Sequence, residues 1–127
     1  MTGTLGATEN TGPELSQLVA SEIHEQKPVT IASGAGVLAR GTVLGLITAS
    51  NQYSQLNPAG VDGTEVARAI LLEDLDATAA AVKAQAFFTG TYRLKDLVWP
   101  GAITDVQKNA AILQLQDRGI LVDEDFV

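Results

Sequence analysis

An apolar run interrupted by two glycines is the feature that most restricts how this chain can fold. The run covers residues 37–48, is rich in β-branched side chains, and is broken by Gly41 and Gly45. β-Branched residues favour strands, and glycines within a strand mark bulges, turns or the close approach of another backbone. The run therefore predicts β-structure that turns or bulges at its glycines.

Several shorter segments have the patterns of further strands. Residues 82–88 alternate with a period of two, which favours a strand although the alanines at 77–88 would also suit a helix. The polar segment 49–64 contains turn-forming pairs such as Asn57-Pro58 and is expected to be a loop. The strand that begins at Gly90 is expected to end at Trp99-Pro100, because proline cannot donate to a strand ladder. The expected strands are 29–31, 66–72, 82–88, 90–94 and 120–122.

One helix is predicted near the C-terminus from its start and stop signals. Thr104 suits the N-cap position, and Gln107 completes a capping box with it. Asp105 suits the positive end of the helix dipole. Gly119 stands where a residue with left-handed backbone would end the helix. The predicted helix therefore begins after Thr104 and ends before Gly119.

Apolar residues form two stripes on this predicted helix. Val106, Ala110 and Leu113 form one stripe, and Ile112 and Leu115 form a second. Two stripes imply two packing surfaces. We expect one stripe to pack on the core of the domain and the other to be available to a neighbouring subunit.

The N-terminal segment has the composition of a mobile arm. Its first thirteen residues are rich in threonine and glycine, and they bury too little apolar surface to offset the entropy of ordering. Residues 13–27 carry aliphatic side chains at helical spacing and suit either a short helix on the domain or a continuation of the arm. The arm residues expected to contact a partner are Leu5, Leu15, Leu18, Val19 and Ile23.

These patterns together predict an α+β fold that is mostly β. The expected architecture is a small glycine-punctuated β-rich domain over residues 28–127, with one C-terminal helix, preceded by a flexible N-terminal arm over residues 1–27.

Charge and composition argue against several classes of function. The formal net charge of −7 disfavours nucleic acid and membrane surfaces as partners, and no apolar run approaches the ~20 residues of a membrane span. The chain has no cysteine and a single histidine, so thiol nucleophiles, thiolate metal sites and multi-histidine sites are excluded. We expect no cofactor, no metal and no enzymatic activity.

Two motifs nevertheless suggest alternatives. Asp74-Leu75-Asp76-Ala77-Thr78 follows an apolar run and resembles the nucleophile loop of haloacid-dehalogenase-like phosphatases, in which two aspartates act beside a magnesium ion. That fold requires a doubly wound parallel sheet and further downstream residues, so an acidic turn after a strand is the simpler interpretation. Lys83 has apolar flanks, and with the glycine-centred run it suggests a biotinyl or lipoyl carrier domain. Lys83 lacks the flanking residues that mark a carrier lysine, and a glycine-kinked hairpin in a small barrel is the simpler interpretation.

The most specific motif lies at residues 90–100, which read Gly-Thr-Tyr-Arg-Leu-Lys-Asp-Leu-Val-Trp-Pro. This stretch resembles the core of the lambda-type bacteriophage head decoration proteins, whose pattern is Gly-Thr-aromatic-Arg, two variable residues, Asp, two aliphatic residues and Trp-Pro. A looser similarity extends over roughly residues 29–122. The matching positions are Gly90, Thr91, Tyr92, Arg93, Asp96, Trp99 and Pro100.

The resemblance implies a non-enzymatic capsid decoration protein that stabilises the shell. Such proteins assemble as homotrimers at three-fold positions on the outer surface of the phage head, so the implied partners are the major capsid protein and further copies of this chain. The protein would be made in the host cytoplasm. The resemblance also implies an N-terminal arm that is loose in solution and ordered on the shell. The arm here is rich in glycine and threonine rather than proline, and the acidic residues 123–125 have no counterpart in the lambda pattern.

Overall fold

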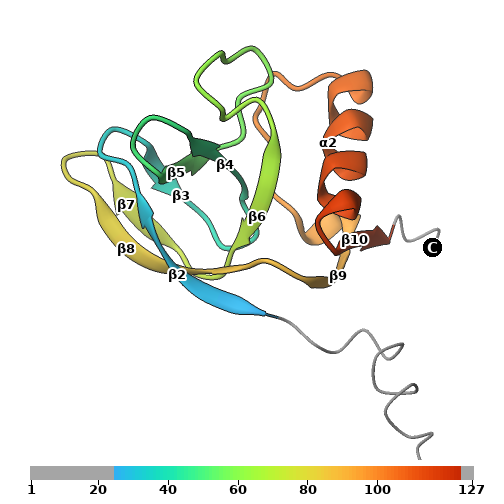
Figure 1. The fold of residues 1–127 in the computed structure, drawn as a ribbon, viewed down its shortest axis with the longest axis horizontal. Coiled ribbons are helices and arrows are strands. Elements are labelled where there is room, and N and C mark those ends of the chain that lie inside the picture. Colours follow the sequence, from blue (N-terminus) through green and yellow to red (C-terminus); the bar gives the residue numbers. More distant parts are fainter. Residues whose placement is uncertain (1–24, 124–127) are drawn as a thin grey trace, which may run out of the picture.

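The computed structural model describes residues 25–123, which form a β-barrel with one helix packed beside it (Figure 1). The strands are β2 (Gln26–Ile31), β3 (Gly36–Leu38), β4 (Val43–Ile47), β5 (Gln52–Gln55), β6 (Ala67–Leu71), β7 (Leu75–Ala77), β8 (Val82–Phe87), β9 (Gly90–Arg93) and β10 (Ile120–Asp123). The helices are η1, a 3-10 helix (Leu94–Asp96), and α2, an α-helix (Asp105–Asp117). Within residues 25–123 the structure confirms the mostly β fold with one α-helix near the C-terminus.

The barrel is closed, with the strand order β2-β5-β4-β6-β8. Strands β2 and β8 pair antiparallel along their whole length, from Gln26 opposite Phe87 to Ile31 opposite Val82. The barrel closes on the other side of β2 through a short parallel contact, in which Ile31 lies opposite Tyr53 of β5. Strands β3 and β7 form a separate two-stranded antiparallel sheet.

The glycine-interrupted run folds as predicted. It forms β3 and β4, and the chain turns between them at Gly41, where the backbone φ is 93°. Gly45 lies within β4, and the pairing of β4 with β6 shifts register between Leu44 and Gly45. A glycine suits this irregular position because it has no side chain that would have to pack on one face of the sheet where the register shifts.

Two short strands were not expected from the sequence. The prediction of a loop over 49–64 was wrong in part, because Gln52–Gln55 form β5 and pair antiparallel with β4. Three of these four residues are polar and weak strand formers, so the strand depends on its neighbours in the barrel rather than on intrinsic preference. Leu75–Ala77 form β7, so the segment predicted as an acidic turn is partly a strand.

The strand at Gly90 is confirmed, but it ends earlier than predicted. Strand β9 stops at Arg93, and residues Leu94–Asp96 form the 3-10 helix η1. The chain then returns to the barrel, where the Val98 amide donates to the Gly41 carbonyl and the Val98 carbonyl accepts from the Val43 amide. The strand has therefore already ended where the chain reaches Pro100.

The helix α2 begins and ends as its signals predict. The Thr104 hydroxyl accepts from the Gln107 amide, and the Gln107 side chain accepts from the Thr104 amide, which completes the capping box. Gly119 has a φ of 95° and follows the C-cap residue Arg118. The chain then enters β10, which pairs parallel with β9, so α2 is the crossover between two parallel strands.

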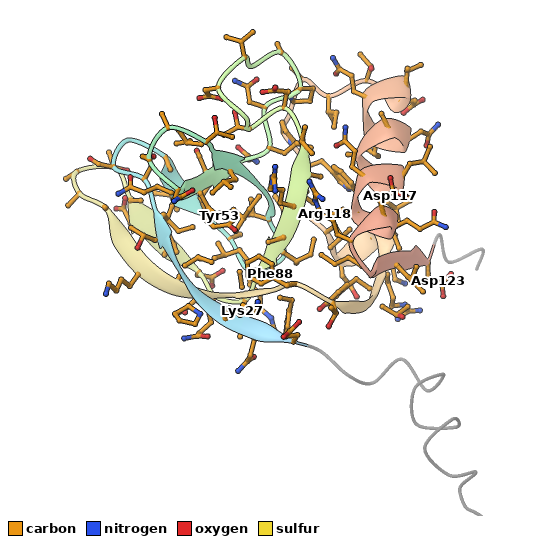
Figure 2. All side chains as sticks on the ribbon, in the orientation of Figure 1. Lys27, Tyr53, Phe88, Asp117, Arg118 and Asp123 are labelled. Carbon is orange, nitrogen blue, oxygen red and sulfur yellow. The ribbon has the colours of Figure 1, made fainter. Side chains whose placement is uncertain are left out.

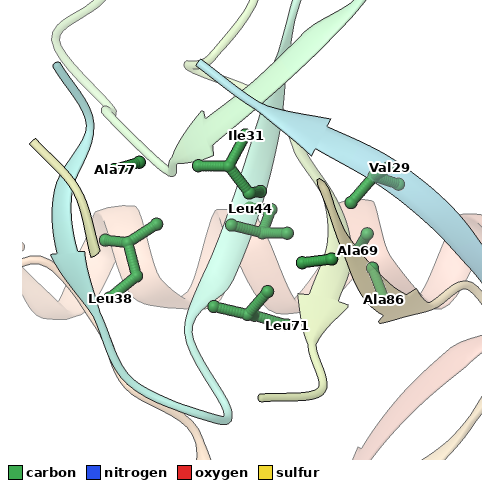
Figure 3. Packing of buried hydrophobic residues seen from close by; sticks show 9 residues of the cluster. Val29, Ile31, Leu38, Leu44, Ala69, Leu71, Ala77 and Ala86 are labelled. Carbon is green, nitrogen blue, oxygen red and sulfur yellow. The ribbon is translucent and has the colours of Figure 1, made fainter. Parts of the chain in front are cut away.

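Two clusters of buried apolar side chains make up the core. One fills the barrel and receives Leu38 and Ala77 from the small β3–β7 sheet (Figure 3). The other lies between the barrel and α2, where Leu115 and Ile120 are fully buried against Val43 and Ile70. Strand β4 joins the clusters, because its successive residues Val43 and Leu44 point to opposite faces.

Candidate functional site

The two aspartates of the phosphatase-like motif serve as hydrogen-bond acceptors in turns. The Asp74 carboxylate accepts from the Arg40 amide at 2.7 Å, and the Asp76 carboxylate accepts from the Thr78 amide at 2.9 Å. Hydrogen bonds from the Thr78 side chain and amide hold the pKa of Asp76 below its ordinary value. Both aspartates flank or lie in β7, whose partner β3 is antiparallel. This arrangement differs from the end of a parallel sheet that the phosphatase hypothesis requires.

Lys83 lies within a strand rather than on a hairpin tip. It belongs to β8, where it stands opposite Thr30 of β2, and its side chain is exposed. A carrier lysine has to project from a tight turn so that it can enter other active sites. The position of Lys83 inside the barrel wall therefore does not fit the carrier-domain hypothesis.

The motif at residues 90–100 holds the C-terminal part of the chain against the barrel. The Gly90 amide donates to the Gly119 carbonyl at 3.2 Å, and β9 carries β10 along its edge. Further along the motif, the Asp96 carbonyl lies so close to Gly41 that a Cβ at position 41 would come within 2.5 Å of it. The motif backbone is thus fixed at both ends, so its side chains have fixed directions.

The aromatic residues of the motif are partly buried between the barrel and α2. The Tyr92 hydroxyl donates to the Thr89 carbonyl at 2.8 Å, its ring lies 5.5 Å from the ring of Phe87, and burial raises its pKa to about 12. Trp99 packs on the same cluster beneath Lys108, whose Nζ atom lies 5.8 Å from the ring centroid. Thr91, Arg93 and Asp96 are exposed, and Pro100 is half-buried. The motif therefore supplies both core packing and surface.

Only one of the two predicted stripes on α2 faces the core. Leu115 is fully buried and Ile112 is half-buried, and Ala111 beside them is also buried. The other stripe remains on the surface, where 78% of Val106 and 61% of Leu113 are exposed. An apolar stripe on an exposed helix face is a candidate surface for contact with another protein.

A basic pocket lies where the described chain begins. It has a volume of about 240 Å³ and is lined by Glu25, Tyr53, Arg68, Phe88, Thr89 and Arg118. The rings of Tyr53 and Phe88 meet edge to face at 6.0 Å. Burial raises the pKa of Tyr53 above 10.0, while the charges of Arg68 and Arg118 act in the opposite direction. The pocket was not foreseen from the sequence, because no motif links its residues.

The predicted arm contacts lie outside the described residues, and they stay a prediction. These residues are Leu5, Leu15, Leu18, Val19 and Ile23. β2 begins at Gln26, so the expected boundary between residues 27 and 28 falls inside this strand. Within residues 25–123, no group of three or more His, Cys, Asp or Glu residues is placed to hold a metal ion, and no helix is long and apolar enough to cross a membrane.

Comparison with known proteins agrees with the motif at residues 90–100. A family model described as bacteriophage lambda head decoration protein D matches residues 8–120. The matched region includes the barrel, the helix α2 and the first residue of β10. No curated protein matches the chain.

Proposed function

Because this chain belongs to the family of bacteriophage lambda head decoration protein D, we propose that it binds as a homotrimer at three-fold positions on the outer surface of a phage head and stabilises the mature shell. The family consists of structural capsid proteins and is not an enzyme family, so the chain has a role in capsid decoration. The match over residues 8–120 is the observation that carries the proposal.

A decoration protein needs no catalytic chemistry. It stabilises the shell by binding the assembled form more tightly than the unassembled subunits, which shifts the equilibrium towards assembly. The major capsid protein is the partner in this proposal. The protein is made in the host cytoplasm and reaches the head surface after assembly.

The exposed stripe on α2 supports assembly of the chain into a homotrimer. Val106 and Leu113 are among the most exposed large apolar residues in the described part of the chain, and Ala110 lies between them on the same helix face. Burying this stripe against another copy would remove apolar surface from water, which favours association. A closed ring of three subunits requires that the stripe of one copy packs on a different, complementary surface of the next copy.

The N-terminal arm would supply the contact with the capsid. Glu25 is held at the edge of the barrel, where its carbonyl accepts from the Phe88 amide and its amide donates to the Thr89 hydroxyl. An arm that leaves from a fixed point can add to an exposed sheet edge of the shell. Once one arm of a trimer has bound, the other two arms are held at a high effective concentration near their sites, so no single arm has to bind strongly. The proposed anchors are Leu5, Leu15, Leu18, Val19 and Ile23.

The test is a deletion of residues 1–24, which keeps Glu25 and all of β2. The truncated protein should fold and assemble as the full chain does, and sedimentation of both proteins at micromolar concentration should give the mass of a trimer. Its affinity for purified heads that lack this protein should fall by at least about two orders of magnitude, because the loss is multiplied over three arms.

Two results would contradict the proposal. A monomeric full-length chain at micromolar concentration would refute assembly into a trimer. Equal affinity of the full and truncated proteins for heads would show that the arm does not hold the capsid, and the contact would then lie on the folded domain.

A further inference from the structure

The basic pocket beside Glu25 is unusual for a protein of this charge. The chain carries a formal net charge of −7, and yet Arg68 and Arg118 both line this one pocket. Lys27 lies beside it, with its Nζ atom 5.6 Å from the ring centroid of Phe88. Three of the chain's eight lysines and arginines therefore surround a pocket whose lining contains one carboxylate, that of Glu25.

One donor of this pocket has no acceptor. The Nε atom of Arg68 is buried and has no hydrogen-bond partner among the described residues. A buried donor without an acceptor is unfavourable, and a guanidinium is best satisfied by a carboxylate, which accepts in a planar two-point geometry. The aromatic rings of Tyr53 and Phe88 form the apolar part of the lining and reduce the access of water to such a pair.

The pocket lies where the arm leaves the domain. Figure 2 shows Lys27 and Phe88 close to β2, with Tyr53 and Arg118 between β2 and α2 in this view. The Glu25 amide donates to the hydroxyl of Thr89, which also lines the pocket. If the arm lies on the capsid, this end of the domain faces the capsid as well.

We propose that the pocket between Arg68 and Arg118 receives a carboxylate side chain of the capsid shell protein. The proposal rests on the proposed function, since it names the chemistry of the group that the shell presents at the base of the arm. The arginines supply two charged donors, and the aromatic rings hold the carboxylate in a partly dry site. This contact would position the domain, while the arm provides the remaining affinity.

A second copy of the chain is a less suitable source of the carboxylate. The stripe available to another copy is on a different side of α2, because Arg118 follows Leu113 by five residues and therefore lies roughly 140° further around the helix axis. Val106 and Leu113 are not among the residues that line the pocket, so a subunit packed on the stripe would cover a different surface.

The experiment compares Arg118→Gln with Lys83→Gln in binding to heads that lack this protein. Both side chains are exposed and both changes remove one positive charge, but Lys83 lies at the opposite end of β8 from Phe88. Arg118→Gln should weaken binding at least about tenfold at 0.1 M salt, and Lys83→Gln less than about twofold. The difference should shrink at 1 M salt, where charges are screened within ~3 Å. Unfolding curves of both variants should coincide with that of the parent.

The outcomes separate this inference from the proposed function. If the parent protein binds heads and Arg118→Gln behaves as Lys83→Gln does, the pocket assignment is overturned and the capsid role stands. If the parent protein does not bind heads at all, both are overturned. The same pair is then measured with Glu9, Glu14 and Glu22 of the arm changed to glutamine. A loss that persists supports the shell as the source, and a loss that disappears assigns the carboxylate to the arm instead.

Discussion

Replacing Gly45 with alanine should destabilise the domain more than the same change at any open glycine. Gly45 is buried in β4, and a Cβ built on it would lie 2.6 Å from both the Cα and the carbonyl oxygen of Thr64. Both atoms belong to backbone and cannot rotate away. The loop that contains Thr64 would therefore have to move by nearly 1 Å to reach ordinary contact, which is an estimate from van der Waals distances.

The expected loss follows from what holds this loop. The Thr64 carbonyl accepts from the Asn57 amide at 2.8 Å, and the Thr48 amide donates to the Asp62 carbonyl at 3.0 Å. Overpacking costs about 1–3 kcal/mol, and weakening one of these bonds costs about 0.5–1.5 kcal/mol. Alanine restricts the unfolded chain and returns about 0.4–1 kcal/mol. Together these ranges give a net destabilisation of about 0.5–4 kcal/mol, with a central value of about 2 kcal/mol.

Denaturant unfolding followed by circular dichroism measures this value against two control glycines. Gly101→Ala should stabilise the domain slightly, by about 0.4–1 kcal/mol, because a Cβ there meets nothing within 4 Å, the backbone is not left-handed, and alanine restricts the unfolded chain. Gly34→Ala also meets nothing, but its φ of 89° should cost about 1–2 kcal/mol. The predicted destabilisation by alanine is largest at Gly45, smaller at Gly34 and absent at Gly101. An alanine at position 45 that is as stable as one at position 101 would refute the reasoning from close approach.

Three further outcomes are expected. Leu113→Asp should leave the fold intact but weaken self-association, because 61% of this residue is exposed in the single chain. Sedimentation equilibrium should show dissociation at concentrations where the parent protein is a trimer, and an unchanged mass would contradict the role of the stripe. Thr104→Ala removes the side-chain half of the capping box and should cost about 1 kcal/mol in denaturant unfolding, whereas Thr104→Ser should cost little. Hydrogen bonds from the Thr64 side chain and amide hold the pKa of Asp62 below 3.8, so the stability that Asp62 contributes is present above that pH and is lost as the pH falls below it. Asp62→Asn should therefore make the free energy of unfolding less dependent on pH between about 5 and 2; parallel plots of that free energy against pH for the variant and the parent would argue against the contribution.

The helix shows how far local patterns reach. Its capping box at Thr104 and its terminal glycine at Gly119 depend on residues within one turn of each other, and both form as predicted. The spacing of apolar residues also predicts the two stripes. Spacing does not predict which stripe faces the core, because that depends on where the barrel lies relative to α2. In the structure Leu115 is buried and Leu113 is exposed.

Strand β5 shows the opposite case. Gln52–Gln55 carry little strand preference, and their pairing with β4 on one side and with Ile31 of β2 on the other makes them a strand. The closure of the barrel therefore depends on contacts between residues about twenty positions apart. No window of neighbouring residues contains that information.

The sequence by itself determined the mostly β fold, the helix α2 and the family, because alternation, capping and the motif at residues 90–100 are properties of neighbouring residues. Only the tertiary structure decided which surfaces those elements leave exposed. Closing the barrel brings Arg68 of β6 and Arg118 at the end of α2 to the pocket beside Glu25, and it leaves Val106 and Leu113 on the outside. Such sites form where distant segments pack together, and packing depends on the whole chain at once.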